Sequence, residues 1–170
     1  MSIPWNPNAQ LYSLRFYAMI SLLHVAFFAY HAFANAFSVW LPEASLLPLN
    51  IFKAIPFLWA VLTAASSIKY YNKAKQCGGG NLKEFLGLYD DELAKSIYQK
   101  AATRMAASMA CTALLLFFMS TELAPYFPQW SLFLNGVTVT SICLSVGLLA
   151  MSLTILSELV EDEPSEHIAN

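Results

Sequence analysis

Residues 16–42 read FYAMISLLHVAFFAYHAFANAFSVWLP and contain no Asp, Glu, Lys or Arg. A helix that crosses a hydrocarbon core about 30 Å thick needs about 20 mostly apolar residues, so this stretch is long enough to span a membrane. Three further stretches are similarly poor in charge. Together they predict four membrane-spanning helices at about 17–39, 48–70, 103–121 and 132–156. The first is too long for the apolar region of a secretory signal, so we expect it to be retained.

The composition of the whole chain favours the same class of protein. Of the 170 residues, 58% are hydrophobic and 12% are charged, whereas soluble domains average roughly 45–50% apolar and 25% charged residues. These proportions disfavour a soluble enzyme, a coiled coil, a disulfide scaffold and a disordered chain. The sequence therefore predicts an all-α fold, an integral membrane four-helix bundle surrounded by a lipid bilayer.

The basic residues predict how the bundle is oriented. Most of the nine lysines and arginines flank or fill the segment between the second and third spans. The positive-inside rule then places this segment and both termini in the cytoplasm of a multi-pass protein in the cell inner membrane. The expected regions are a cytoplasmic N-terminus (1–16), a transmembrane hairpin (17–71), a cytoplasmic loop and helical extension (72–102), a second transmembrane hairpin (103–156) and an acidic cytoplasmic tail (157–170).

The cytoplasmic segment opens with three glycines at 78–80, which we interpret as a hinge. Asn81 and Glu84 have the spacing of a capping box for a short helix, and Asp90 or Asp91 suits the N-cap of the next helix. We hypothesise that this region docks a cytoplasmic protein partner. The alternative is a solvated connector whose lysines only fix topology. The candidate docking residues are Lys73, Lys75, Lys83, Asp90, Asp91 and Glu92.

The first predicted span carries polar side chains along one helical face, at Tyr17, Ser21, His24, His31 and Asn35. The two histidines lie about two turns apart. Ligation of haem by both would need partners from another helix or subunit, and the three cysteines are too far apart in sequence to favour a zinc site. The remaining interpretation, which we prefer, is hydrogen bonding between helices.

The last predicted span carries hydroxyl groups at Thr138, Ser141, Ser145 and Ser152. Small polar residues of this kind usually pack against a neighbouring helix, and the alternative is that they line a channel. The third span has small residues at Ala102, Ala106 and Ala110, a ladder that lets helix backbones approach closely, either inside the bundle or between subunits.

Function is less sharply indicated. The four predicted spans lack Asp and Glu, which disfavours proton-coupled antiport, and the chain has no Cys-x-x-Cys and no hydrolase or phosphate-binding motif. Its net charge of -2 gives no support for nucleic-acid binding. We therefore expect no catalytic residue, no metal site and no cofactor.

The function hypothesis is a non-enzymatic accessory membrane subunit. It would be a homo-oligomeric anchor, sensor or pore (channel) subunit that couples to a cytoplasmic partner, with the general layout of small accessory, immunity or phage-defence proteins. The alternative is a membrane redox subunit that binds haem or quinone through His24 and His31.

Overall fold

The structure, a computed structural model, describes residues 7–40, 46–79, 82–123 and 125–161. In this part of the chain the regular structure is entirely helical, the helices are joined by turns and short irregular segments, and there is no strand. In chain order the elements are α1 (Pro7–Trp40), α2 (Leu46–Gln76), α3 (Leu82–Phe85), α4 (Glu92–Phe118), a π-helical turn η1 (Met119–Leu123), α5 (Pro128–Phe133) and α6 (Gly136–Glu161). The predicted all-α fold is confirmed.

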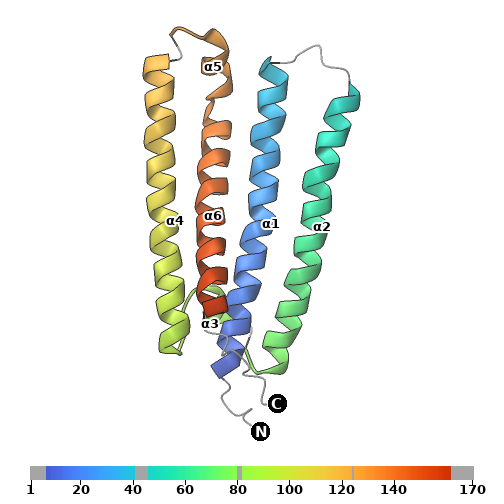
Figure 1. Ribbon diagram of the computed structural model, residues 1–170, viewed down its shortest axis with the longest axis vertical. Helices are drawn as coiled ribbons and strands as arrows, with labels where there is room; N and C mark the ends of the chain where they lie inside the picture. The colour runs from blue at the N-terminus through green and yellow to red at the C-terminus, as the bar shows by residue number, and fades with distance from the viewer. Residues whose placement is uncertain (1–6, 41–45, 80–81, 124, 162–170) are drawn as a thin grey trace, which may run out of the picture.

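Four long helices lie side by side in a row, in the spatial order α4, α6, α1, α2 (Figure 1). Helix α1 packs along both α2 and α6, and α6 also packs along α4. The α1–α2 hairpin and the α4–α6 hairpin therefore meet through the contact between α1 and α6. Helix α3 lies at the lower ends of the long helices and α5 at the upper ends (Figure 1).

Three helical segments are long and apolar enough to cross a membrane: Ala9–Ala36, Glu92–Leu123 and Gly136–Val160. They overlap the first, third and fourth predicted spans. The second predicted span falls within α2, and its first part, residues 48–56, lies outside the residues whose side chains the structure describes. Helix α4 begins at Glu92, before the predicted start of the third span at 103.

The helix that corresponds to the fourth predicted span begins later in the structure than the hydropathy of the sequence suggests. Helix α5 ends at Phe133, and α6 begins at Gly136 instead of Leu132. The cause is a local cap, because the Asn135 side-chain oxygen accepts a hydrogen bond of 2.9 Å from the backbone N–H of Thr138. Such a bond satisfies an N–H group that the first turn of a helix leaves without a partner.

The main hydrophobic core lies at the ends of the long helices nearest α3. It joins residues of α1, α4 and α6 to Tyr89 in the connection before α4: Leu14, Ala18, Tyr89, Ala94, Ile97, Ala101, Met151, Ile155 and Leu159. Toward the α5 end, large side chains of α4 such as Leu114, Leu115 and Phe117 are exposed. Exposed apolar side chains are what a lipid-facing helix requires.

Candidate functional site

The connection between α2 and α4 folds back onto the start of α1. We call its described residues, 77–79 and 82–91, the α3 platform. Ser13 Oγ of α1 donates a hydrogen bond to Oε2 of Glu84, whose carboxylate is buried. Gln10 Oε1 of α1 accepts a hydrogen bond of 2.9 Å from the backbone N–H of Asp91. Two side chains of α1 thus hold the platform at points several residues apart.

Two glycines allow the platform to approach its neighbours closely. A Cβ atom on Gly79 would lie 2.9 Å from the carbonyl oxygen of Ala9 in α1. Gly87 has a φ of +77°, and a Cβ atom there would lie 2.4 Å from Cε1 of Tyr98 in α4. The residue types at both positions are therefore fixed by packing. Of the predicted glycine hinge, Gly78 has a φ of +87°, Gly79 is buried against α1, and Gly80 lies outside the described residues.

Three tyrosines, one each from the platform, α1 and α4, meet where the platform packs on the long helices. The Tyr98 ring lies between those of Tyr17 and Tyr89, with ring centroids 5.7 and 5.5 Å away. Tyr89 is 6% exposed, and its hydroxyl group is buried without a hydrogen-bond partner among the described residues. Burial raises the pKa of Tyr89, and the neighbouring Tyr98 and Glu84 raise it further.

Three of the six candidate docking residues, Asp91, Lys73 and Lys75, make contacts within the chain. Asp91 is a helix cap, since its Oδ2 accepts a hydrogen bond of 2.9 Å from the Ala94 N–H. The Lys73 and Lys75 ammonium groups lie 5.5 and 5.7 Å from the ring centres of Tyr12 and Tyr71, within cation–π range.

The remaining three, Lys83, Asp90 and Glu92, have exposed side chains. The structure records no hydrogen bond or ion pair between these side chains and other described residues. Lys73 and Lys75 are exposed as well, so five of the six candidates present charge at the surface.

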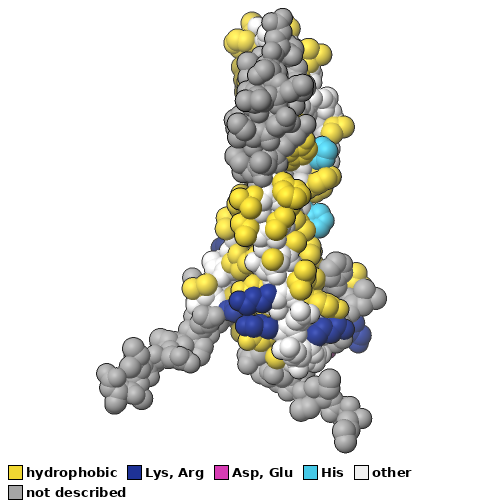
Figure 2. Space-filling model, turned by 90° about the vertical axis from the view of Figure 1, so that its right-hand side faces the viewer, with side chains coloured by type: hydrophobic (Ala, Val, Ile, Leu, Met, Phe, Trp, Pro, Cys, Tyr) yellow, Lys and Arg dark blue, Asp and Glu magenta, His cyan; other side chains and the backbone are white. Residues whose placement is uncertain are grey.

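The residues of the polar stripe predicted on α1 do not share one environment: some contact other helices, and the two histidines are exposed. Ser21 is buried, Tyr17 contacts Tyr98, and Asn35 Nδ2 donates hydrogen bonds to Thr138 Oγ1 and, at 3.2 Å, to the Phe133 carbonyl. His24 and His31 are exposed instead, and Figure 2 shows histidine side chains at the surface among hydrophobic ones.

The histidines contact their own helix. His24 Nδ1 lies 2.8 Å from the Ile20 carbonyl oxygen, and the His31 ring lies edge-on to Phe27 with 4.5 Å between ring centroids. The preferred interpretation, hydrogen bonding of both histidines between helices, therefore does not describe the contact that His24 makes.

The hydroxyl face of α6 lies largely at helix contacts. Thr138, Ser141 and Ser152 are buried, and the buried Ser145 Oγ has no partner in the described part of the chain. Ser152 Oγ donates to the Leu148 carbonyl of its own helix. Burial of these side chains favours packing over a channel lining.

The close approach between α4 and α6 uses a different small residue from the predicted ladder. Ala106 and Ala110 are exposed. A Cβ atom on Gly147 of α6 would lie 2.4 Å from Cγ of Met109 and 3.3 Å from Cγ of Met105. Gly147 therefore allows α6 to approach these methionines of α4.

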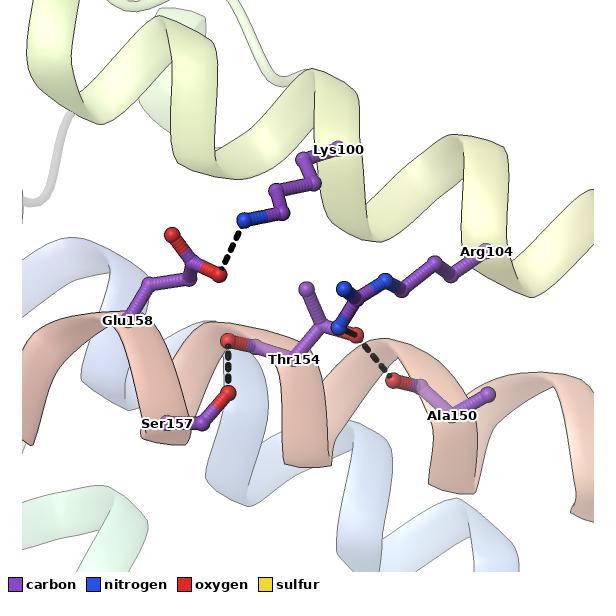
Figure 3. Close-up of polar contacts among 6 residues, drawn as sticks. All are labelled: Lys100, Arg104, Ala150, Thr154, Ser157 and Glu158. Carbon is purple, nitrogen blue, oxygen red and sulfur yellow. Dashed lines mark hydrogen bonds and ion pairs between the residues drawn. The ribbon is translucent and has the colours of Figure 1, made fainter.

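Polar contacts between α4 and α6 near the α3 end are absent from the sequence-based predictions (Figure 3). Lys100 Nζ forms an ion pair with Glu158 Oε1, and Arg104 Nη1 donates a hydrogen bond of 3.3 Å to Thr154 Oγ1. The sequence-based interpretation uses Lys100 and Arg104 only to predict membrane topology. The two residues are one helical turn apart, as are Thr154 and Glu158, and this shared spacing could have indicated that the two pairs face each other.

Comparisons with protein-family models, with curated proteins and with solved structures found no match to this chain. What the protein does is therefore inferred from its own residues.

Proposed function

We propose that this chain is a non-enzymatic, multi-pass protein of the cell inner membrane that anchors a cytoplasmic partner protein through the α3 platform. In this proposal α1, α2, α4 and α6 form the membrane layer as a four-helix bundle, and the platform and both termini face the cytoplasm. The observation that carries the proposal is the ordered packing of the platform onto α1 and α4.

Order in this connection supports a role in recognition. A connector that only fixes topology needs basic residues at suitable positions and no tertiary packing. Here the buried carboxylate of Glu84 is hydrogen-bonded to Ser13, and the backbone at Asp91 is bonded to Gln10. Ordering a chain segment costs conformational entropy, roughly 1–2 kcal/mol per residue, which these contacts must offset.

The outer side of the platform has the mixed character of a protein interface. Leu86 and Leu88 are 63% and 60% exposed, and the charged side chains of Lys83 and Asp90 are exposed near them in sequence. Apolar residues rimmed by polar ones are typical of surfaces that bind other proteins. These four residues make up the proposed docking surface.

The orientation can be tested with the native Cys77 in the platform. The Cys111→Ser/Cys143→Ser variant leaves Cys77 as the labelling site, and adding Cys77→Ser/Ser131→Cys moves it to the exposed α5 end. A membrane-impermeant maleimide is applied to right-side-out and inside-out vesicles. We expect Cys77 to react only in inside-out vesicles, and the cysteine introduced by Ser131→Cys to react only in right-side-out vesicles. The opposite pattern would contradict the orientation.

Docking can be tested by photo-crosslinking in cells. A benzophenone amino acid replaces Leu88 in the platform or, as a control, the similarly exposed Leu132 in α5. We expect the probe at Leu88 to yield a discrete adduct with a cytoplasmic protein that is lost on charge reversal by Lys83→Glu/Asp90→Lys. Adducts that are the same at both positions, or insensitive to the reversal, would contradict the proposal.

The proposed anchor is a homo-oligomer. Support comes from the open row, in which the edge helices α2 and α4 each pack along one long neighbour and leave the opposite side uncovered by the described chain. Mass measurement in lipid nanodiscs at two protein concentrations tests this directly. A chain that is monomeric at both would contradict it.

A second candidate function is a membrane redox subunit that binds haem or quinone through His24 and His31. The supporting observation is that both histidines are exposed on α1 and are therefore accessible to a ligand or a second copy. The ultraviolet–visible spectrum of purified protein tests the haem alternative. A Soret band that disappears in His24→Leu and in His31→Leu would support it, and its absence from the unsubstituted protein would remove haem.

A further inference from the structure

A groove lies between α1 and α2 in the apolar part of the molecule. Its volume is about 570 Å³, and its lining includes His24, Phe27 and Tyr30 from α1 with Phe57 and Ala60 from α2. His24 falls near the middle of the membrane-compatible segment Ala9–Ala36. A ligand in this groove would therefore reach it from within the bilayer and away from the polar headgroups.

The groove is bounded by a contact between the two helices. Trp59 Nε1 of α2 donates a hydrogen bond of 3.1 Å to the Leu22 carbonyl of α1. Leu22 and Trp59 directly precede two lining residues, Leu23 of α1 and Ala60 of α2. Phe27 and Phe57 are 57% and 72% exposed, so the aromatic walls of the groove stay open toward the surroundings.

The hydrogen bond made by His24 determines what the groove presents to a ligand. Its Nδ1 atom lies 2.8 Å from the Ile20 carbonyl oxygen. A carbonyl oxygen only accepts, so Nδ1 carries the hydrogen, and in the uncharged ring Nε2 is then a hydrogen-bond acceptor. The structure records no partner for Nε2 among the described residues. An acceptor in an apolar medium is costly unless a donor pairs with it.

We infer that this groove binds a lipid-soluble quinol. The aromatic head of a quinol suits walls built from Phe27, Tyr30 and Phe57. Its phenolic hydroxyl group supplies the donor that Nε2 of His24 requires, and its tail extends into the bilayer through the open side. The oxidised quinone has only carbonyl acceptors and cannot pair with Nε2. A phospholipid acyl chain offers no donor at this depth.

The inference deepens the second candidate function and rests on its use of His24, but it requires no contact with the α3 platform. It concerns binding alone and includes no electron transfer. Failure of the binding test would therefore leave the platform proposal untouched, and failure of the crosslinking test would leave the groove untouched.

The test is equilibrium binding of a decyl-substituted hydroquinone to the full chain in nanodiscs under anaerobic conditions. Matched probes are the corresponding quinone and the dimethyl ether of the hydroquinone, which keep the ring and tail but lack the hydroxyl donor. Matched variants are His24→Leu, His24→Gln and Phe33→Leu. Phe33 is a 63% exposed side chain of the same helix that does not line the groove.

We expect saturable binding of the hydroquinone that weakens about tenfold in His24→Leu, the effect of losing one hydrogen bond to a polar group in an apolar site. His24→Gln, which retains an acceptor, should bind more tightly than His24→Leu, and Phe33→Leu should bind as the unsubstituted chain does. Both donor-free probes should bind about tenfold more weakly than the hydroquinone. Equal affinity for the three probes, equal loss in His24→Leu and Phe33→Leu, or no saturable binding would overturn the inference.

Discussion

At the scale of single residues, the phenol of Tyr89 is an unusual component of the core, to which it is the contribution of the α3 platform. Its ring packs with Tyr98, while its hydroxyl group is buried without a partner among the described residues. A buried polar group left without a hydrogen bond costs about 1–3 kcal/mol. The ring of Tyr89 thus stabilises this core and its hydroxyl group opposes that stabilisation.

Replacing Tyr89 with Phe should preserve or raise stability near neutral pH, by up to about 1 kcal/mol, because the ring stays and the unpaired hydroxyl group is removed. It should also reduce sensitivity to alkali. Burial raises the pKa of Tyr89 above its ordinary value of 10.0, so the unfolded chain loses this proton first and stability falls as the pH rises above about 10. The measurement is the free energy of unfolding against pH in detergent.

Tyr126→Phe is the matched control, since Tyr126 is 78% exposed at the α5 end. It should leave the alkaline loss of stability unchanged. The same alkaline slope in Tyr89→Phe and in the unsubstituted chain would contradict the role assigned to Tyr89.

Individual contacts of the platform differ in how far sequence can predict them. The cap by Asp91 is predictable, because a cap depends on residues adjacent in the chain. The spacing of Glu84 predicts a local capping box with Asn81, which lies outside the described residues, and the structure pairs the Glu84 carboxylate with Ser13 of α1. A bond between residues so distant in sequence leaves no local pattern.

At the scale of helices, the close contact between α4 and α6 depends on a single glycine. Periodicity correctly indicates small residues on α4, but it cannot tell which of several faces meets a neighbour. The predicted face with Ala106 and Ala110 is exposed, and the contact uses Met105 and Met109 against Gly147 instead. In a membrane both faces are apolar, so hydropathy carries little information about which is buried.

Gly147→Leu should destabilise the chain by about 1–3 kcal/mol, because its side chain would overlap Met109 and push α6 away from α4. Gly147→Ala should have a smaller effect, since the flexible Met109 side chain can move. Gly136→Leu is the control, because nothing lies within 4 Å of a Cβ atom there. Thermal unfolding in detergent measures all three. Equal effects of Gly147→Leu and Gly136→Leu would contradict the close contact.

At the scale of the whole molecule, one core joins the two hairpins at the α3 end. The long uncharged stretches are enough to predict helical hairpins, since short connections force neighbouring helices to run antiparallel. The lateral order of the row cannot be predicted in this way. It depends on which side chains of α1 and α6 meet, and residues such as Leu14 and Ile155 do not differ in type from lipid-facing leucines and isoleucines.

Ile155→Ala should cost about 2–5 kcal/mol, because Ile155 is fully buried in this core. Leu153→Ala, two positions earlier on α6, is the control, since Leu153 is 56% exposed and its truncation should change stability by less than about 0.5 kcal/mol. Trypsin cleavage after the exposed Lys83 should accelerate in Ile155→Ala alone. Equal cleavage rates in both variants would show that the platform does not depend on the core.

The composition of this core also has a consequence for biogenesis. Its residues come from α1, from the connection before α4, from α4 and from α6, the last helix of the described chain. During synthesis the core around Tyr89 therefore cannot be completed until α6 has been made and has joined α1. A partner whose binding depends on the position of Tyr89 would then bind finished chains more tightly than nascent ones.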